Sequence, residues 1–180
     1  MRKVVAYSLV SVDGVAEDPD QFLFSFDKMM EANLGEVIQT QDTVLLGRKM
    51  YDEWSEYWPT SDDQPFADFI NNVQKYVATG TPLTTQWTHA EAIQGPVEDF
   101  VRELQAREGG DIGVHGSISL TQSLLAAGLV DEVRLLVAPR VAGTGRRLFD
   151  NEAAHSLELV HGTGSPSGSL LVHYKVVTGD

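Results

Sequence analysis

"DIGVHGSISL", residues 111–120, changes character at its midpoint. Asp111 to His115 is apolar enough for a short buried strand, and Gly116 then removes the side chain at the strand's end. Ser117 is a residue type that commonly caps a helix, and the apolar spacing up to Gly128 predicts that helix. A bare backbone beside a helix N-terminus suits a negatively charged group such as a phosphate. Close packing of strand and helix is the alternative explanation.

A second junction of the same kind lies in "DTVLLGRKMYDEW", residues 42–54. The buried strand 42–47 ends at Gly47, and a helix starts at once with Arg48 and Lys49. Cations in a first turn oppose the helix dipole, so their placement indicates an anion between them and the helix end. The alternative is that both glycines only permit tight chain reversal. Because ligands of open α/β sheets bind beyond the carboxyl ends of strands, we expect both junctions at one edge.

Strands and helices alternate along the rest of the chain. Strands are expected at 3–9, 42–47, 75–79, 111–115 and 131–141, and helices at 22–39, 48–54, 66–73, 96–107 and 117–128. The tail adds two strands, 156–162 and 169–177, joined by a glycine-rich turn. This order predicts an α/β fold with a mostly parallel central sheet, helices on both faces and a C-terminal antiparallel hairpin at the edge. We expect one domain over residues 1–180.

The composition excludes several classes of function. The chain has 13 Lys and Arg against 26 Asp and Glu, a net charge of −13 with neutral histidine. Such a surface repels nucleic acid and anionic membranes, so neither is an expected partner. The chain has no cysteine, hence no disulfide framework, and no run approaches the ~18 apolar residues of a membrane span. We expect a cytoplasmic protein that holds any anionic ligand with local donors.

Other chemistry-bearing side chains have less specific patterns. The five histidines show no metal-binding pair, and Ser117 lacks a nucleophile elbow, so neither a metal site nor a serine hydrolase is expected. His115 stands beside Gly116, although a partly buried strand-end residue is the simpler interpretation. "GTGR", residues 143–146, lacks the further glycine of a dinucleotide fingerprint, so it is interpreted as a tight turn, with the edge of a cofactor groove as the alternative. Four aromatic residues near an acidic loop either pack in the core or face a ligand pocket: Trp54, Tyr57, Trp58 and Phe66.

Four stretches together resemble the dihydrofolate reductase-like superfamily, which includes the reductase domain of riboflavin biosynthesis. They are "RKVVAYSLVSVDG", "TVLLGRKMYDEW", "KYVAT" and "GSISLTQSLLAAGLVDEVRLLVAPRVAGTGRRLF", which run from residue 2 to residue 149. Each stretch is a weak signal, but their order along the chain is specific. The resemblance implies a three-layer α/β sandwich and a reductase that uses a nicotinamide cofactor, usually NADPH.

The resemblance also implies where the cofactor binds. One family segment, G-R-x-T, holds cofactor phosphates, and here Met50 replaces its threonine. A second glycine motif brings the backbone against the pyrophosphate, and a residue after the third strand contacts the adenosine side. The residues at the matching positions are Gly47, Arg48, Lys49, Met50, Thr79, Gly116, Ser117 and Ile118.

The resemblance is weaker at the substrate end. Dihydrofolate reductases carry a carboxylate in the first long helix, but Asp27, Glu31 and Glu36 all fall in or near that helix, and a solvated helix face explains them equally well. The riboflavin-pathway reductase tends to have an acidic residue where this chain has Val114. Asp13, in the loop after the first strand, is the catalytic candidate, because an acid there could orient the substrate or relay a proton.

These observations predict an NADPH-dependent reductase that transfers hydride to a small heterocyclic substrate, like dihydrofolate reductase or 5-amino-6-ribosylaminouracil reductase. The alternative is a non-catalytic nucleotide-binding protein of the same fold. A homodimer is also expected, because riboflavin-type members commonly pair. The apolar strands "EVRLLVAPRV" and "SLLVHYKVV" are expected near a sheet edge, where a second chain could cover them.

Overall fold

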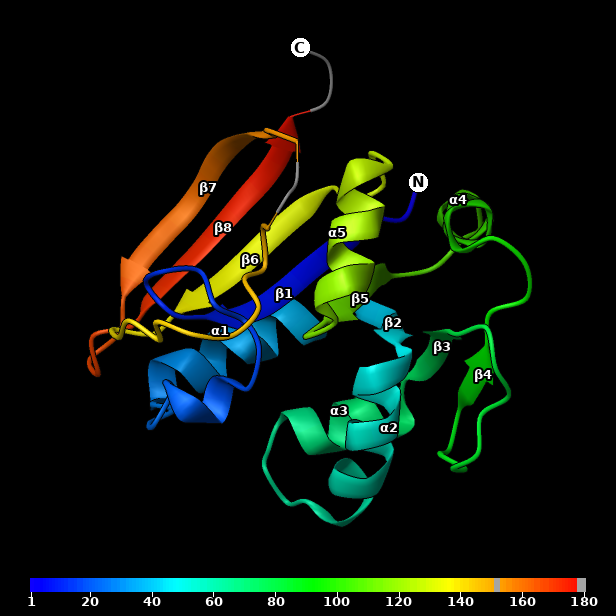
Figure 1. Ribbon diagram of the computed structural model, residues 1–180, viewed down its shortest axis with the longest axis horizontal. Helices are drawn as coiled ribbons and strands as arrows, with labels where there is room; N and C mark the ends of the chain where they lie inside the picture. Colours follow the sequence, from blue (N-terminus) through cyan, green and yellow to red (C-terminus); the bar gives the residue numbers. More distant parts are fainter. Residues whose placement is uncertain (151–152, 178–180) are drawn as a thin grey trace.

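One eight-stranded sheet runs through the computed structural model, which describes residues 1–150 and 153–177, in the order β4-β3-β2-β5-β1-β6-β8-β7 (Figure 1). The strands are β1 (Val4–Val10), β2 (Gln41–Gly47), β3 (Gln74–Ala78), β4 (Ala90–Ala92), β5 (Asp111–His115), β6 (Glu132–Val137), β7 (Ser156–Gly164) and β8 (Leu170–Val177). Neighbours from β4 to β6 are parallel, whereas β8 pairs antiparallel with β6 and β7. The predicted α/β fold with a C-terminal antiparallel hairpin is confirmed.

Helices cover both faces of the sheet (Figure 1). They are α1 (Lys28–Ile38), α2 (Arg48–Tyr57), α3 (Phe66–Asn72), α4 (Val97–Ala106) and α5 (Ile118–Ala126), with short 3-10 helices at Pro19–Gln21 and Trp58–Thr60. On one face, Leu104 of α4 and Leu124 of α5 pack with Val114 of β5. On the other, Leu34 of α1 and Ile70 of α3 pack in a second apolar core. Because both faces are covered, the central strands are nearly continuous apolar runs.

The first helix is shorter than its apolar spacing predicted. It begins at Lys28, because the Asp27 carboxylate accepts hydrogen bonds from the backbone N–H groups of Met29 and Met30, each at 3.0 Å. Phe22 lies outside the helix and is buried in a small core under the loop. The expected start at residue 22 was therefore wrong, since Phe22 packs into this core from outside the helix.

The edge of the sheet also differs from the prediction. β6 ends at Val137, ahead of Pro139, and lies inside the sheet between β1 and β8. The edge strand on that side is β7, which has β8 as its only neighbour in the sheet. At the opposite edge the sequence analysis missed β4, because its three residues are too few to show a strand pattern. Within the described residues, no helix is long and apolar enough to cross a membrane.

Candidate functional site

The two glycine junctions meet at the carboxyl edge of the sheet. β2 and β5 are neighbours, so Gly47 at the end of β2 lies beside Ser117, which follows β5. The Gly47 N–H donates to Ser117 Oγ at 2.9 Å, and a Cβ at Gly47 would lie 3.6 Å from Ser117 Cβ. Ser117 is the N-cap residue of α5, as predicted, but its side chain makes no capping hydrogen bond to the helix. Its hydroxyl instead joins the two junctions.

The backbone conformation at position 116 favours glycine. Its φ of 66° lies in the left-handed region, which L side chains rarely adopt. A Cβ at this position would also lie 3.2 Å from Met50 Cε and 3.4 Å from Trp54 Cζ2. The glycine therefore keeps the end of β5 bare between the starts of α2 and α5.

A cleft of about 1080 Å³ opens over this edge of the sheet. Most of the cofactor-binding residues predicted from the sequence line it, namely Gly47, Arg48, Lys49, Met50, Gly116, Ser117 and Ile118. Thr79 does not line the cleft, but its hydroxyl accepts a hydrogen bond from Arg48 Nη1 at 3.1 Å. Residues from separate parts of the chain are thus gathered around one cavity.

The Arg48 guanidinium is oriented by its own neighbours. Its Nε donates to both carboxylate oxygens of Asp52, at 2.8 and 3.0 Å, one turn further along α2. Its Nη1 donates to the Thr79 and Thr81 hydroxyls and to the Pro82 carbonyl oxygen. The side chain stays 26% exposed. A planar guanidinium fixed in this way, beside two threonine hydroxyls, fits a phosphate group.

Arg146 is a further cation of the cleft, in the stretch "GTGR" that the sequence predicted to form a tight turn or to border a cofactor groove. Its Nη2 donates to the hydroxyl of Ser119, in the first turn of α5, at 2.9 Å. Its backbone N–H donates to Glu17 Oε2 at 3.0 Å, and Lys49 Nζ lies 3.5 Å from the other oxygen of Glu17. Lys49 and Arg146 therefore approach the cleft from different elements. Only the arginine after the glycine turn could have signalled this in the sequence.

Asp13, the predicted catalytic residue, is occupied by hydrogen bonds and is not among the residues that line the cleft. Its carboxylate accepts the Ser11 hydroxyl at 2.5 Å and the backbone N–H groups of Ala142 and Gly143 at 2.9 and 2.8 Å. These bonds, that of Ser11 first, hold the pKa of Asp13 well below its usual range. The geometry gives Asp13 a structural function, which is to tie the loop after β1 to the loop after β6. We assign it no proton transfer.

One carboxylate of α1 lines the cleft, and it is Glu31. Asp27 caps the helix and accepts the Ser167 hydroxyl at 2.6 Å, and Glu36 is exposed away from the cleft. The three carboxylates were equally good candidates for substrate binding in the sequence, and in the structure Glu31 alone of the three lines the cleft. Within residues 1–150 and 153–177, no three His, Asp or Glu side chains are grouped to hold a metal ion.

Aromatic side chains form a wall and floor of the cleft. Phe66 packs edge-on against Trp54 and Trp58, with ring centroids 5.4 and 4.9 Å apart, and against His115 at 5.3 Å. His115 Nε2 is 2.8 Å from Gln41 Oε1, and burial lowers the pKa of His115 to about 3, so the ring is neutral. Trp54, Trp58, Phe66 and His115 all line the cleft. The sequence had left open whether the aromatic residues pack in the core or face a ligand pocket, and these three aromatics face the cleft.

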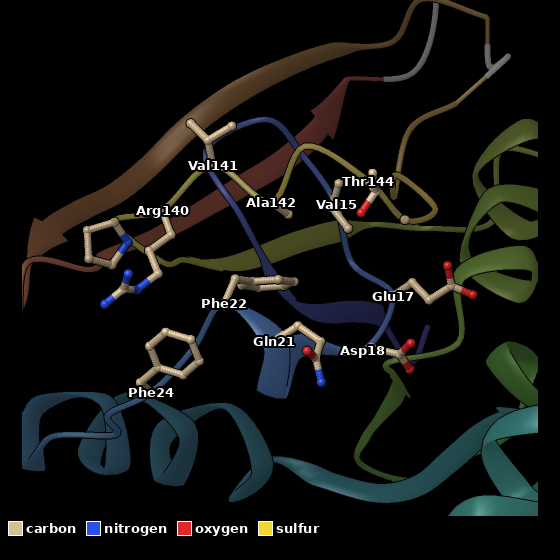
Figure 2. Close-up of a pocket in the computed structure, with 12 residues that line it drawn as sticks. Val15, Glu17, Asp18, Gln21, Phe22, Phe24, Arg140, Val141, Ala142 and Thr144 are labelled. Carbon is tan, nitrogen blue, oxygen red and sulfur yellow. The ribbon is translucent and has the colours of Figure 1, made fainter.

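A second cavity, of about 620 Å³, lies on the other side of the loop after β1 (Figure 2). Figure 2 shows Phe22 and Phe24 facing Arg140 and the loop after β6. The Arg140 guanidinium lies over the Phe24 ring, 4.4 Å from its centroid. Asp18 lines both cavities, so this loop is the partition between them.

The model of the RibD C-terminal domain family matches residues 2–171 of the chain. The chain belongs to the RibD C-terminal domain family. Two relatives of this RibD-type domain are the uncharacterized proteins YyaP and YwjB of Bacillus subtilis (strain 168). Each is 28% identical and aligns with 96% of this chain, over 94% of YyaP and 97% of YwjB.

Solved structures show the same fold. A Shewanella sp. PV-4 protein named for riboflavin biosynthesis matches with a TM-score of 0.79 and 16% identity, over 97% of this chain and 99% of that one. The Thermotoga maritima diaminohydroxyphosphoribosylaminopyrimidine deaminase/5-amino-6-(5-phosphoribosylamino)uracil reductase gives 0.69 and 14%, over 98% of this chain and 57% of that longer one. Dihydrofolate reductase from Enterococcus faecalis, complexed with NADP(H), gives 0.64 and 13%, over 97% and 96%. The RibD-type domain therefore has the dihydrofolate reductase-like fold that the sequence resemblance implied.

Proposed function

We propose that the protein is a reductase that uses NADPH and transfers hydride to a small heterocyclic substrate. The observation that carries the proposal is the joining of two glycine-marked helix N-termini at one edge of the cleft, with Arg48, Lys49 and Arg146 around them. Helix N-termini and oriented cations both favour phosphate groups. Membership of the RibD C-terminal domain family, and the NADP(H) complex of a dihydrofolate reductase with this fold, support the same cofactor.

The residues at the cleft fit the parts of this cofactor. The pyrophosphate fits the bare backbone at Gly116, where even one Cβ would crowd Met50 and Trp54. The additional phosphate that distinguishes NADPH from NADH fits Arg48 with its threonine neighbours. The bound cofactor supplies the hydride, and the protein holds donor and acceptor against each other. Positioning of this kind can contribute about 7–11 kcal/mol to lowering a barrier.

The substrate fits the space between α1 and residues 54–66. Glu31 is the α1 carboxylate that lines this space, and a carboxylate accepts hydrogen bonds from the ring N–H groups of a heterocycle. Flat side chains opposite it, among them Trp58 and Phe66, suit a planar ring.

The test is to mix the protein with NADPH and candidate acceptors and to follow the absorbance at 340 nm, where NADPH is consumed. We expect NADPH to bind and at least one heterocycle to oxidise it. Tight NADPH binding without oxidation by any acceptor would favour a non-catalytic nucleotide-binding protein. Failure to bind NADPH would reject both proposals.

We also propose that a second copy of the chain covers the apolar face of the C-terminal hairpin. The register pairs Leu157 with Val176 and Leu159 with Tyr174, so these side chains share one face. Leu157 is 39% and Leu159 58% exposed. Apolar side chains on an edge strand invite pairing with another chain, and a two-fold contact is the commonest way to cover them.

A further inference from the structure

Among the described residues, three lysine and arginine side chains line the cleft, and they lie together in one part of it, with Glu17 and Glu53 beside Lys49. Arg48 and Lys49 form the first turn of α2, and Arg146 bonds to Ser119 of α5 at 2.9 Å. We call this region the phosphate part. The proposed function uses these cations for the phosphates of NADPH.

The other region, which we call the acceptor part, lies between α1 and residues 54–66. It is lined by apolar and acidic side chains, among them Phe26, Glu31, Leu34, Trp58, Asp62 and Phe66. In the described ranges, no lysine or arginine lines it. Lys28 is the cation that pairs with Glu31, at 2.9 Å, but its side chain is 93% exposed and lies outside the lining. The acceptor part therefore offers an anionic group no cationic partner.

The acceptor part also holds polar atoms that can recognise a heterocycle. Tyr7 Oη, Trp58 Nε1 and His115 Nδ1 are buried without a hydrogen-bond partner among the described residues, and all three residues line the cleft. An indole N–H donates only, whereas a phenol donates or accepts and a neutral imidazole nitrogen does one or the other. Burying such atoms unpaired costs free energy. A carbonyl oxygen or unprotonated ring nitrogen of a bound heterocycle would accept from Trp58 Nε1, a ring N–H would donate to His115 Nδ1, and Tyr7 Oη could pair with either kind of group.

We propose that the substrate is a planar heterocycle, neutral or cationic, that carries no phosphate or carboxylate group. This inference rests on the proposed function, because it assumes that NADPH occupies the phosphate part. A carboxylate or phosphate in the acceptor part would lie near Glu31, Asp62 and Asp63, where no lysine or arginine among the described residues lines the cleft to bind it. This substrate differs from the 5-amino-6-(5-phosphoribosylamino)uracil in the name of the Thermotoga maritima enzyme, which contains a phosphate.

The experiment compares ligands that share a ring and differ in charge. Protein saturated with NADP⁺ is titrated by calorimetry with dihydrobiopterin and with dihydrofolate, which adds two carboxylates to the same ring system. A second pair is 5-amino-6-ribosylaminouracil and its 5′-phosphate. We expect the member without the anionic group to bind at least about tenfold more tightly in one or both pairs.

A charge reversal in the acceptor part sharpens the test. Asp62 is exposed at the rim of the cleft, so Asp62→Lys changes the local charge without removing a core contact. Glu56→Lys changes the net charge equally, on an exposed residue of α2 that does not line the cleft. We expect Asp62→Lys to improve binding of the anionic member, so that the ratio of the two dissociation constants in a pair decreases by at least about threefold. Glu56→Lys should leave this ratio unchanged.

The outcomes separate this inference from the function on which it rests. If NADP⁺ does not bind, the proposed function fails and the inference falls with it. If NADP⁺ binds and the anionic members bind as tightly as their partners, or no member of either pair binds at millimolar concentration, the inference alone is overturned. An equal effect of Asp62→Lys and Glu56→Lys would also overturn it, because the preference would then reflect net charge and not the acceptor part.

Discussion

At the residue scale, the two positions that shape the cleft are Gly116 and His115. His115 is the last residue of β5 and Gly116 follows it directly, and the structure gives a separate physical reason for each residue type. Gly116 adopts a left-handed backbone conformation. His115 is a fully buried neutral base on the cleft floor, paired through one ring nitrogen with Gln41. A Cβ at Gly113 would overlap Gln41 Oε1, so a third position of the strand is glycine to make room for that pair.

The substitution Gly116→Ala should lower the free energy of unfolding by about 1–2 kcal/mol, because a side chain in the left-handed region is strained. The added methyl also lies 3.2 Å from Met50 Cε, so NADPH affinity should fall as well. Urea unfolding and cofactor titration measure the two effects. Gly80→Ala is the control, since a Cβ there meets nothing within 4 Å and should change stability by less than about 0.5 kcal/mol. Equal stability of the two variants would contradict the account.

Burial of His115 predicts a pH dependence of stability. Burial lowers the pKa of His115 to about 3, and the unfolded value is near 6.5. Between these values the unfolded state binds the additional proton, so stability decreases as the pH falls below 6.5, by up to about 1.4 kcal/mol per pH unit. Urea unfolding at pH 7, 6 and 5 measures the slope, above the range in which most carboxylates titrate. His115→Gln should flatten it, and an unchanged slope in that variant would show that another group is responsible.

At the scale of elements, α1 has a start that is fixed by a capping residue and an interior glycine whose replacement should stabilise the helix. The helix begins where Asp27 accepts two backbone N–H groups, and Gly35 lies in its interior with nothing within 4 Å of an added Cβ. Gly35→Ala should therefore raise the free energy of unfolding by about 0.5–1 kcal/mol, because alanine loses less backbone entropy in a helix. Chemical denaturation measures the gain. A loss of stability in Gly35→Ala would contradict this prediction.

The sequence predicted the order of the elements because strand and helix periodicities are strong in the central strands and in α4. It could not predict the start of α1, since Phe22 and Phe26 fit helical spacing although both precede the helix and Phe22 packs in a separate small core. The strand–glycine–helix pattern located the two glycine junctions, family resemblance assigned them to a cofactor, and the sheet order places them side by side. The function of Ser117 could not be read from its residue type, because its hydroxyl bonds to Gly47, seventy residues away. Asp27, Glu31 and Glu36 could not be told apart from the sequence, because only their surroundings show that Glu31 lines the cleft and Asp27 caps α1.

At the scale of the whole molecule, the C-terminal hairpin has two unlike faces. The face with Leu157 and Leu159 is apolar, whereas the other face pairs Glu158 with Lys175 and His161 with His173. This asymmetry is typical of a sheet that buries one side. We expect light scattering at micromolar concentration in physiological salt to give the mass of a dimer.

Leu159→Glu should convert that dimer to a monomer, because it places a charge on the apolar face. His161→Glu adds the same charge to the polar face of the same strand, and it should leave the mass unchanged. A wild-type mass of one chain that stays constant on tenfold concentration would refute the dimer.

The central claim is that the joined junctions hold NADPH, and the most direct measurement is a fluorescence titration of the protein with NADPH and with NADH at low salt. A charge-assisted contact between Arg48 and the additional phosphate contributes about 1.5–3 kcal/mol, so NADPH should bind about one to two decades more tightly. Arg48→Ala should remove most of that difference. Arg102→Ala, on an exposed face of α4, should retain it. Equal dissociation constants of the wild-type protein for NADPH and NADH would contradict the account.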